Sequence, residues 1–239
     1  MGLDFGVFVG TYFILPDTKK LIQGITLDRI GRDGKLFPFV AGPKNRKFVR
    51  LNQIPKSLQT AVLSLEDARF YQHLGIDWVE LKIAISTNIE DGKKLRGASS
   101  ISQQLVKNLY LFSERSFRRK ILEALITIKL ENTLTKNQIL ELYLNSIDWG
   151  RGLLGISDAT IYYFKKNPDE LNLKESVFLA AIIPNPSRFG KFTEDKIPKR
   201  FVRTQMMRAL QEMYRAGNIK FNDFEEVMEN PYKFNEDEF

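Results

Sequence analysis

The sequence predicts a mainly α-helical protein with a little β structure near its start. From Asn52 onward, apolar residues recur at the three- and four-residue spacing of buried helix faces. Polar capping pairs, three residues apart, precede several of these apolar runs. Before Asn52, turn signals at 32–34 and 42–43 indicate short strands or irregular structure. With 239 residues and no internal repeat, the chain is long enough for one domain with a sizeable core.

The first long helix is predicted to begin at Pro55 and to end before Gly75. Asp77 and Glu80 form a capping pair for the second helix. The apolar residues predicted to be buried on these two helices are Leu58, Ala61, Val62, Leu65, Trp78, Leu81 and Ile85.

Two further helices are predicted between residues 99 and 134. Ser99 or Ser100 caps the first, and the second spans 116–134. Helical periodicity predicts that their inward faces comprise Ile101, Leu105, Leu109, Phe117, Ile121, Leu125 and Ile128.

The later helices have recognisable starts and stops. Capping boxes at 135–138 and 172–175 precede two of them, and a glycine-rich turn precedes a third. In chain order the predicted spans are 139–145, 156–164, 172–184 and 198–217, with a short helix before the acidic tail.

Composition excludes several kinds of site. The chain has no cysteine, which rules out disulfides, thiolate catalysis and thiolate metal sites. Its one histidine, His73, rules out a multi-histidine metal centre and is interpreted as a structural hydrogen-bonding residue. The formal net charge is +7, although residues 222–239 hold seven acids and one lysine. The basic remainder suits nucleic acid, anionic lipid or a phosphorylated substrate, and charge alone does not choose among them.

Residues 5–15 form an uncharged, mostly apolar run of eleven. This is about half of the ~20 residues that span a bilayer, and it has neither the basic start nor the cleavage site of a signal peptide. Two interpretations stay open: a buried or surface-docked helix, and the outer half of a membrane anchor.

Two glutamates, Glu66 and Glu123, are candidate catalytic residues because each lies in or at the end of an apolar helical run. Between Lys82 and Lys120 the chain has nine lysines or arginines against three acids. Two carboxylates with a cationic cradle suit sugar transfer from a phosphorylated donor. The alternatives are structural: a solvated Glu66 beside Arg69, and a Glu123–Lys120 ion pair on an exposed helix face.

The strongest polar constellation is 97–108, where small residues precede a helix N-terminus. Backbone N–H groups at such a terminus can approach an anion closely. Lys107 lies two turns on, and four more cations follow at 115–120, so this set could neutralise a pyrophosphate. An ordinary N-cap with a solvated basic face would look the same. Nucleic-acid binding is disfavoured, because the aromatic residues occupy core positions and form no stacking motif.

Four ordered motifs resemble those of the peptidoglycan glycosyltransferases of glycosyltransferase family 51. Residues 66–75 match Glu-Asp-x-x-Phe-x-x-His-x-Gly in full. Residues 97–108 match Gly-x-Ser-Thr-Ile-x-Gln-Gln-x-x-Lys-Asn, except that Ser100 replaces threonine. Residues 119–123 match Arg-Lys-x-x-Glu, and 139–145 match Ile-Leu-x-x-Tyr-Leu-Asn.

The resemblance covers roughly residues 35–190 and implies a lysozyme-like helical head with a smaller, membrane-facing jaw lobe. It implies an enzyme that polymerises lipid II, a disaccharide-pentapeptide on undecaprenyl pyrophosphate, into β-1,4-linked glycan with inversion. The implied partners are lipid II, the growing glycan, the membrane surface and cell-wall synthesis proteins, but not nucleic acid. The implied location is the cytoplasmic membrane, with the catalytic domain on its periplasmic or extracellular side. No cofactor is obligatory, although a divalent cation (Mg²⁺ or Mn²⁺) could assist, and no all-protein metal site is expected.

By position, the resemblance makes Glu66 the general base that deprotonates the acceptor 4-hydroxyl. It makes Glu123 a residue of the donor region that helps to stabilise the leaving pyrophosphate, directly or through a cation. Lys107 and Arg115 match the cations that hold the pyrophosphate. The donor-cleft and supporting residues that it implies are Ser99, Gln103, Gln104, Asp67 and Lys120.

The expected organisation is an anchor remnant over 1–16, a glycosyltransferase domain over 17–217, and a short helix with an acidic tail over 218–239. The chain has no Ser-x-x-Lys or Lys-Thr-Gly motif, so no penicillin-sensitive transpeptidase domain is expected. Two rival functions stay open. A lysozyme-like glycan hydrolase would have little use for Lys107 and Arg115, and a non-catalytic cell-wall scaffold would not need both glutamates.

Overall fold

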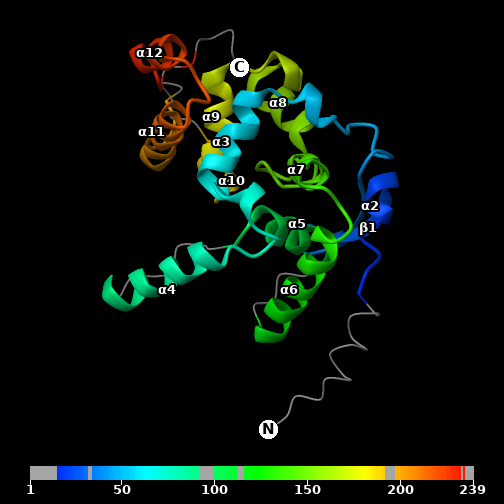
Figure 1. The fold of residues 1–239 in the computed structure, drawn as a ribbon. Coiled ribbons are helices and arrows are strands. Elements are labelled where there is room, and N and C mark those ends of the chain that lie inside the picture. The colour runs from blue at the N-terminus through cyan, green and yellow to red at the C-terminus, as the bar shows by residue number, and fades with distance from the viewer. Residues whose placement is uncertain are drawn as a thin grey trace. The chain divides into compact units, whose positions relative to one another are not determined.

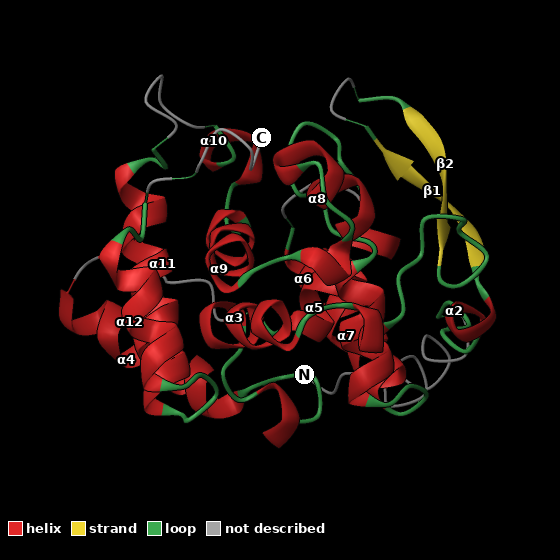
Figure 2. Ribbon diagram, turned by 90° about the horizontal axis from the view of Figure 1, so that it is seen from above, coloured by secondary structure: helices red, strands yellow, loops and turns green. Residues whose placement is uncertain are grey.

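A computed structural model of the chain forms two compact units, unit 1 (residues 1–44 and 71–143) and unit 2 (45–70 and 144–239). The described segments are mainly helical with one two-stranded sheet (Figures 1 and 2), which confirms the predicted fold class. None of the described helices is both long and apolar enough to span a bilayer. Most of the predicted anchor remnant lies outside the described residues. The structure describes residues 15–31, 34–91, 99–111, 116–191, 197–232 and 234.

Unit 1 begins with a short helix and a β-hairpin, the yellow arrows of Figure 2. The two strands pair antiparallel in a register that runs from Ile25↔Ala41 to Ile30↔Leu36. In chain order the elements of this unit are α2 (Lys20–Gln23), β1 (Ile25–Ile30), β2 (Leu36–Ala41), α4 (Trp78–Asp91), α5 (Ile101–Tyr110), α6 (Phe117–Glu131) and α7 (Lys136–Leu144).

Helix α5 is largely buried in unit 1 and packs against α6 and β1. Ser100, not Ser99, is its N-cap. The Ser100 hydroxyl accepts a hydrogen bond from the Gln103 N–H, and the Gln103 side-chain oxygen accepts one from the Ser100 N–H, both at 3.2 Å. This reciprocal pair is a capping box. The predicted inward residues Ile101, Leu105 and Leu109 are all buried.

The prediction for the inward face of α6 is wrong. Phe117 is 82% exposed, and Ile121 and Ile128 are exposed as well. The buried residues of this helix are Glu123, Ile126, Thr127 and Leu130. The prediction followed the most apolar stripe, whereas the buried face is the one that carries the Glu123 carboxylate. The apolar stripe is therefore left at the surface.

Helix α4 begins as predicted, but its first residue is not buried. The Asp77 carboxylate accepts hydrogen bonds from the N–H groups of Val79 and Glu80 at 2.9 and 3.0 Å. Such a cap satisfies N–H groups that have no partner within the helix. Trp78 is 69% exposed, so the predicted burial of this residue is wrong.

Unit 2 is built around α9, which is buried from Glu175 to Ile182. Figures 1 and 2 show α3, α9 and α11 side by side, and α9 packs against both of the others. Three short 3₁₀ turns accompany the helices, at Leu51–Gln53, Phe70–Gln72 and Pro168–Glu170. The helices are α3 (Lys56–Glu66), α8 (Ile156–Phe164), α9 (Leu173–Ile182), α10 (Pro186–Phe189), α11 (Arg200–Arg215) and α12 (Phe221–Glu229).

Helix α3 is shorter than predicted. Pro55 is its N-cap, and the helix ends at Glu66 rather than close to Gly75. Asp67 has φ −163° and ψ 73°, which leaves the helical conformation. Phe70 follows in a separate 3₁₀ turn and is 1% exposed. The chain turns to bury Phe70, so the helix stops one residue before Asp67.

Phe234 completes an aromatic cluster in unit 2. Its ring centroid lies 5.5 Å from that of Phe178 and 6.0 Å from that of Phe164. We expect Phe234→Ala to lower the free energy of unfolding by about 3–4 kcal/mol, because burial is lost and a cavity remains. Urea denaturation measures this change. Phe221→Ala, at an exposed position, is the control, and equal losses from both variants would contradict the assignment of Phe234 to the core.

Candidate functional site

A groove of about 540 Å³ opens on unit 1, within the range of small-molecule binding sites. It lies between the end of β1, the last turns of α5 and the first turns of α6. Its lining consists of residues 28–31 and 107–111 together with Ser99, Arg119, Lys120 and Glu123.

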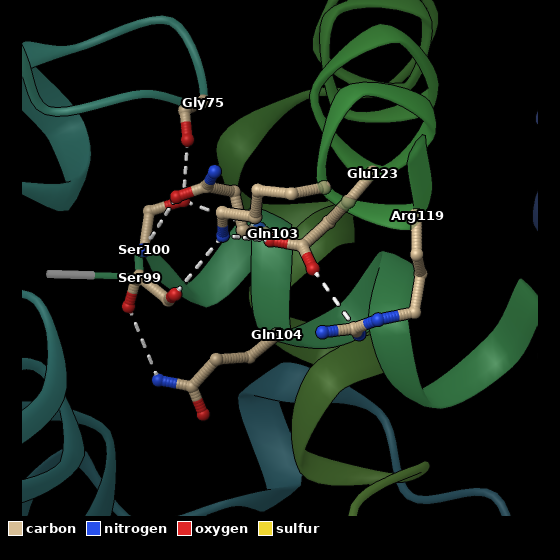
Figure 3. A network of polar contacts seen from close by, with 8 residues as sticks. Gly75, Ser99, Ser100, Gln103, Gln104, Arg119 and Glu123 are labelled. Carbon is tan, nitrogen blue, oxygen red and sulfur yellow. Dashed lines mark hydrogen bonds and ion pairs between the residues drawn. The ribbon is translucent and has the colours of Figure 1, made fainter. Parts of the chain in front are cut away.

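Glu123 is a buried carboxylate in this groove, with 3% of its side chain exposed. Lys120 Nζ donates a hydrogen bond to Glu123 Oε1, and Arg119 Nη1 lies 3.6 Å from Glu123 Oε2. Figure 3 shows the Glu123 and Arg119 side chains pointing toward each other. The ion pair with Lys120 that the sequence offered as an alternative is present. It lies in a groove with a buried carboxylate, however, and not on an exposed face.

The groove favours anions. Its lining carries the cations Arg29, Lys107, Arg119 and Lys120 against the carboxylates Asp28 and Glu123. Since two of the cations are paired with Glu123, the carboxylate also fixes where these positive charges lie. Preorganised cations of this kind stabilise a negative charge without the cost of reorganising when the charge develops.

The segment before α5 is held by side-chain contacts (Figure 3). Lys120 Nζ lies 3.4 Å from Ser99 Oγ, and Gln104 Nε2 donates to the Ser99 carbonyl oxygen at 3.3 Å. The Tyr143 hydroxyl of α7 donates to Gln104 Oε1 at 3.0 Å. Gln104 thus connects Ser99 to α7, and Lys120 connects it to α6, so three helices position this rim of the groove.

Gly75 lies against α6, where no side chain fits. The Ser100 hydroxyl donates to the Gly75 carbonyl oxygen, which ties this residue to the cap of α5. Gly75 has φ +87°, and a Cβ atom there would lie 2.6 Å from Thr127 Cγ2 and 2.9 Å from Glu131 Cγ. His73 supports the turn, since its Nδ1 accepts from the Gly75 N–H at 3.1 Å, which confirms the structural role predicted for it.

We expect Gly75→Ala to lower the free energy of unfolding by about 2–4 kcal/mol, because it combines backbone strain with overpacking. Urea denaturation checks this value. Gly34→Ala is a matched control in the same unit: Gly34 also has positive φ, at +78°, but a Cβ atom there would meet nothing within 4 Å. If the two variants lost the same stability, crowding against α6 would not be the reason for the glycine.

Tyr110 contributes a neutral phenol to the groove. Burial, and then the nearby carboxylate of Asp17, raise the pKa of Tyr110 well above its usual value. Its hydroxyl oxygen is buried and has no hydrogen-bond partner among the described residues. The phenol therefore stays protonated at physiological pH and does not reduce the positive charge of the groove.

The described part of the groove does not fit a divalent metal ion. Hard cations such as Mg²⁺ take several oxygen ligands, commonly carboxylates. Both oxygens of Glu123 face basic side chains, Lys120 and Arg119, and the other carboxylate, Asp28, is exposed. A metal ion at Glu123 would have to displace Lys120. The lining instead provides its positive charge from side chains.

Four of the predicted site residues line this groove: Ser99, Lys107, Lys120 and Glu123. Gln103 and Gln104 lie behind them on α5, where Gln103 is buried in the capping box and Gln104 holds the Ser99 carbonyl. Arg115 lies outside the described residues.

Glu66 and Asp67 belong to unit 2, at the C-terminal end of α3. Glu66 is the last residue of the helix and is half-buried. Asp67 is the C-cap, and its side chain is buried. The apolar face of α3, which packs against α9, fixes the end of the helix. The Glu66 carboxylate therefore extends from a rigid element and is only partly solvated.

Arg119 was predicted among the cations at 115–120, and it lies four residues before Glu123 on the same helix face. One part of the groove was not identified from the sequence. The end of β1, residues 28–31, belongs to no motif. It reaches the groove because β1 packs against α5, a tertiary contact that periodicity does not reveal.

Comparison with known proteins places the chain beside enzymes of cell-wall synthesis. The sequence model of the Transglycosylase family matches residues 33–214. Penicillin-binding protein 1A of Aquifex aeolicus is 35% identical over 254 residues, which cover 99% of this chain and 34% of that protein. The biosynthetic peptidoglycan transglycosylase of Chromobacterium violaceum is 44% identical over 145 residues, covering 61% of this chain and 64% of that protein.

The corresponding transglycosylase of Thiobacillus denitrificans is 40% identical over 156 residues, covering 65% of this chain and 67% of that protein. The chain thus spans about a third of the length of the Aquifex protein and about two thirds of the length of the two transglycosylases.

Proposed function

The chain belongs to the Transglycosylase family, whose sequence model covers residues 33–214, and from this premise we propose that it is a peptidoglycan glycosyltransferase. The proposed substrate is lipid II. The enzyme joins its disaccharide units into β-1,4-linked glycan with inversion and releases undecaprenyl pyrophosphate. The observation that carries the proposal is the cationic groove of unit 1, with the buried Glu123 at its centre.

The groove is proposed to bind the pyrophosphate of the glycan donor. Lys107 and Lys120 supply exposed ammonium groups, and Arg119 supplies a guanidinium from the same face of α6. As the bond between the anomeric carbon and the pyrophosphate oxygen breaks, negative charge grows on the departing group. Cations already in place stabilise that charge. Glu123 is assigned the role of positioning Lys120 and Arg119.

Glu66 is proposed to act as the general base. It takes the proton of the acceptor's 4-hydroxyl while that oxygen attacks the anomeric carbon of the donor. Its place at the end of α3 supports this role, because the carboxylate is half-buried on a helix that the core of unit 2 holds. Asp67, buried as the C-cap, is assigned to support the end of the helix.

A lipid-linked substrate requires contact with a membrane, and unit 1 has exposed apolar side chains suited to it. They belong to α4 and its preceding turn and to the outer stripe of α6. We assign this surface to the cytoplasmic membrane, with the transferase domain, residues 17–217, on the outer side. The exposed apolar residues of these segments are Leu74, Trp78, Val79, Ile83, Phe117, Ile121, Leu122 and Ile128.

The experiment that tests this function is glycan polymerisation from labelled lipid II in detergent. Glycan strands should form and undecaprenyl pyrophosphate should be released. A folded protein that formed no polymer would overturn the proposal. Shortening of preformed glycan would identify a hydrolase instead. If a folded protein showed neither polymerisation nor hydrolysis, the result would favour a non-catalytic scaffold.

A further inference from the structure

Unit 2 contains a second groove, of about 480 Å³, along α11. This helix has two distinct faces. One is buried and apolar, with Val202, Met206, Ala209, Leu210 and Met213. The groove runs along the other face, and Tyr232 also lines it. The helix residues that line it are Arg200, Arg203, Thr204, Met207, Arg208 and Gln211.

Within the part of the chain that the structure describes, no acid forms an ion pair with Arg200, Arg203 or Arg208. Arg215, at the end of the same helix, does have one, since its Nη1 lies 3.3 Å from Glu212 Oε1. Three like charges on one helix face repel one another, so the groove gains stability from an added anion.

Arg203 is held in place for such an anion. Its guanidinium carbon lies 5.5 Å from the centroid of the Tyr232 ring, a distance that suits a cation–π contact. Its Nε is buried and has no hydrogen-bond partner among the described residues. A buried donor without a partner is unfavourable. Arg203 therefore lines the groove as a cation that Tyr232 holds and that no described acid neutralises.

We propose that this groove binds a phosphate group carried on a small organic headgroup. Guanidinium groups match the geometry of phosphate oxygens and bind them through paired hydrogen bonds. The volume exceeds the size of a lone phosphate ion, and Met207 and the Tyr232 ring provide apolar contact for the attached group. The inference goes beyond the proposed transferase activity, since none of these residues belongs to the groove of unit 1.

The phosphate could come from an anionic phospholipid or from a soluble phosphate ester. Two titrations of the full chain distinguish these sources. In the first, glycerol 3-phosphate is added in solution while the Nε–Hε resonance of Arg203 is followed by NMR. In the second, binding is measured to vesicles of phosphatidylcholine with and without phosphatidylglycerol, at fixed ionic strength.

The test variant is Arg200→Gln/Arg208→Gln, which retains the stacked Arg203. The control is Lys191→Gln/Arg215→Gln, which removes the same charge from exposed positions of unit 2. Each groove arginine should contribute about fivefold to affinity for a phosphate-bearing surface. The test variant should therefore bind about 25-fold more weakly in whichever titration detects binding, and the control should lose less than fivefold.

A soluble source predicts that glycerol 3-phosphate moves the Arg203 resonance and that vesicle binding is the same for both variants. A lipid source predicts a difference between the variants only with phosphatidylglycerol vesicles. If test and control variants behaved alike in both titrations while keeping the same melting temperature, the arginines would be an ordinary solvated face and the proposal would be wrong.

Discussion

Glu66→Gln should reduce glycan polymerisation by about 10²–10⁴-fold, the contribution typical of a positioned general base. Glutamine has nearly the same shape but cannot accept the proton of the acceptor hydroxyl. The substitution leaves α3 and its buried face unchanged, since Leu58, Ala61 and Val62 supply the packing. The measurement is the initial rate of polymer formation from labelled lipid II at saturating concentration.

Glu225→Gln is the matched control for this variant, because it removes one exposed carboxylate from the same unit. It should retain full activity. The free energy of unfolding of Glu66→Gln should stay within about 1 kcal/mol of the starting protein, as for a partly exposed position. A Glu66→Gln variant with undiminished polymerisation would remove Glu66 from the mechanism and leave the family assignment intact.

Glu123→Gln should lower kcat by about 10²–10³-fold, as losses of preorganised charge stabilisation commonly do. Without the carboxylate, Lys120 and Arg119 lose the partner that fixes them in the groove. The loss should appear in kcat more than in KM, because the charge on the pyrophosphate grows as the bond breaks. Polymerisation rates over a range of lipid II concentrations separate the two parameters.

Two further variants test whether the loss of kcat comes from the positioning of cations by Glu123: a double variant with Lys120, and a control at a second carboxylate of α6. Since Glu123 is assigned to position Lys120 as well as Arg119, the Lys120→Gln/Glu123→Gln variant should lose less activity than the two single losses combined. Glu131, also on α6, accepts a hydrogen bond from the Ser102 hydroxyl and lies 2.7 Å from Lys136 Nζ. Glu131→Gln should lower stability while the activity of the folded fraction persists. Additive losses, or an equal loss of kcat in Glu131→Gln, would contradict a positioning role for Glu123.

The helix starts and spans that depend on capping residues nearby in the sequence could be predicted closely. The capping box at Thr135 and Gln138 is present, with the Thr135 N–H 2.9 Å from Gln138 Oε1. So is the one at Asn172, whose side chain accepts from the Glu175 N–H at 2.9 Å. Helix α8 has the predicted span. In each case the deciding contacts lie within a few residues of sequence, so the residue types are sufficient.

The faces of α6 and α4 could not be predicted in this way. Periodicity identifies an apolar stripe, but it does not say whether that stripe meets the protein core or another apolar medium. On α6 the stripe containing Phe117 is exposed, and the opposite face is buried with the charged Glu123. The same uncertainty applied to Trp78 at the start of α4. Both departures concern apolar side chains that are exposed on unit 1, the surface proposed above to contact the membrane.

The sequence predicted the parts of the candidate site that belong to the recognised motifs. The motif segments 97–108 and 119–123 supply the rim and the buried carboxylate of the groove. The wall formed by residues 28–31 could not be anticipated, since only the packing of β1 on α5 brings it there. The groove along α11 could not be predicted from the sequence either. Its arginines are spaced as on any basic helix, and what distinguishes them is that none forms an ion pair with an acid in the described part of the chain.

During synthesis, one helix of unit 2 is made well before the helices against which it packs. Helix α3 packs against α9 and α11, which follow it by more than a hundred residues. At a synthesis rate of about 5–20 residues per second, α3 waits roughly 8–30 s for both partners to be made. Until α9 is made, the apolar face of α3 has neither of these two partners. A newly made chain therefore exposes the apolar face of the segment that later holds the proposed base to aggregation and proteolysis.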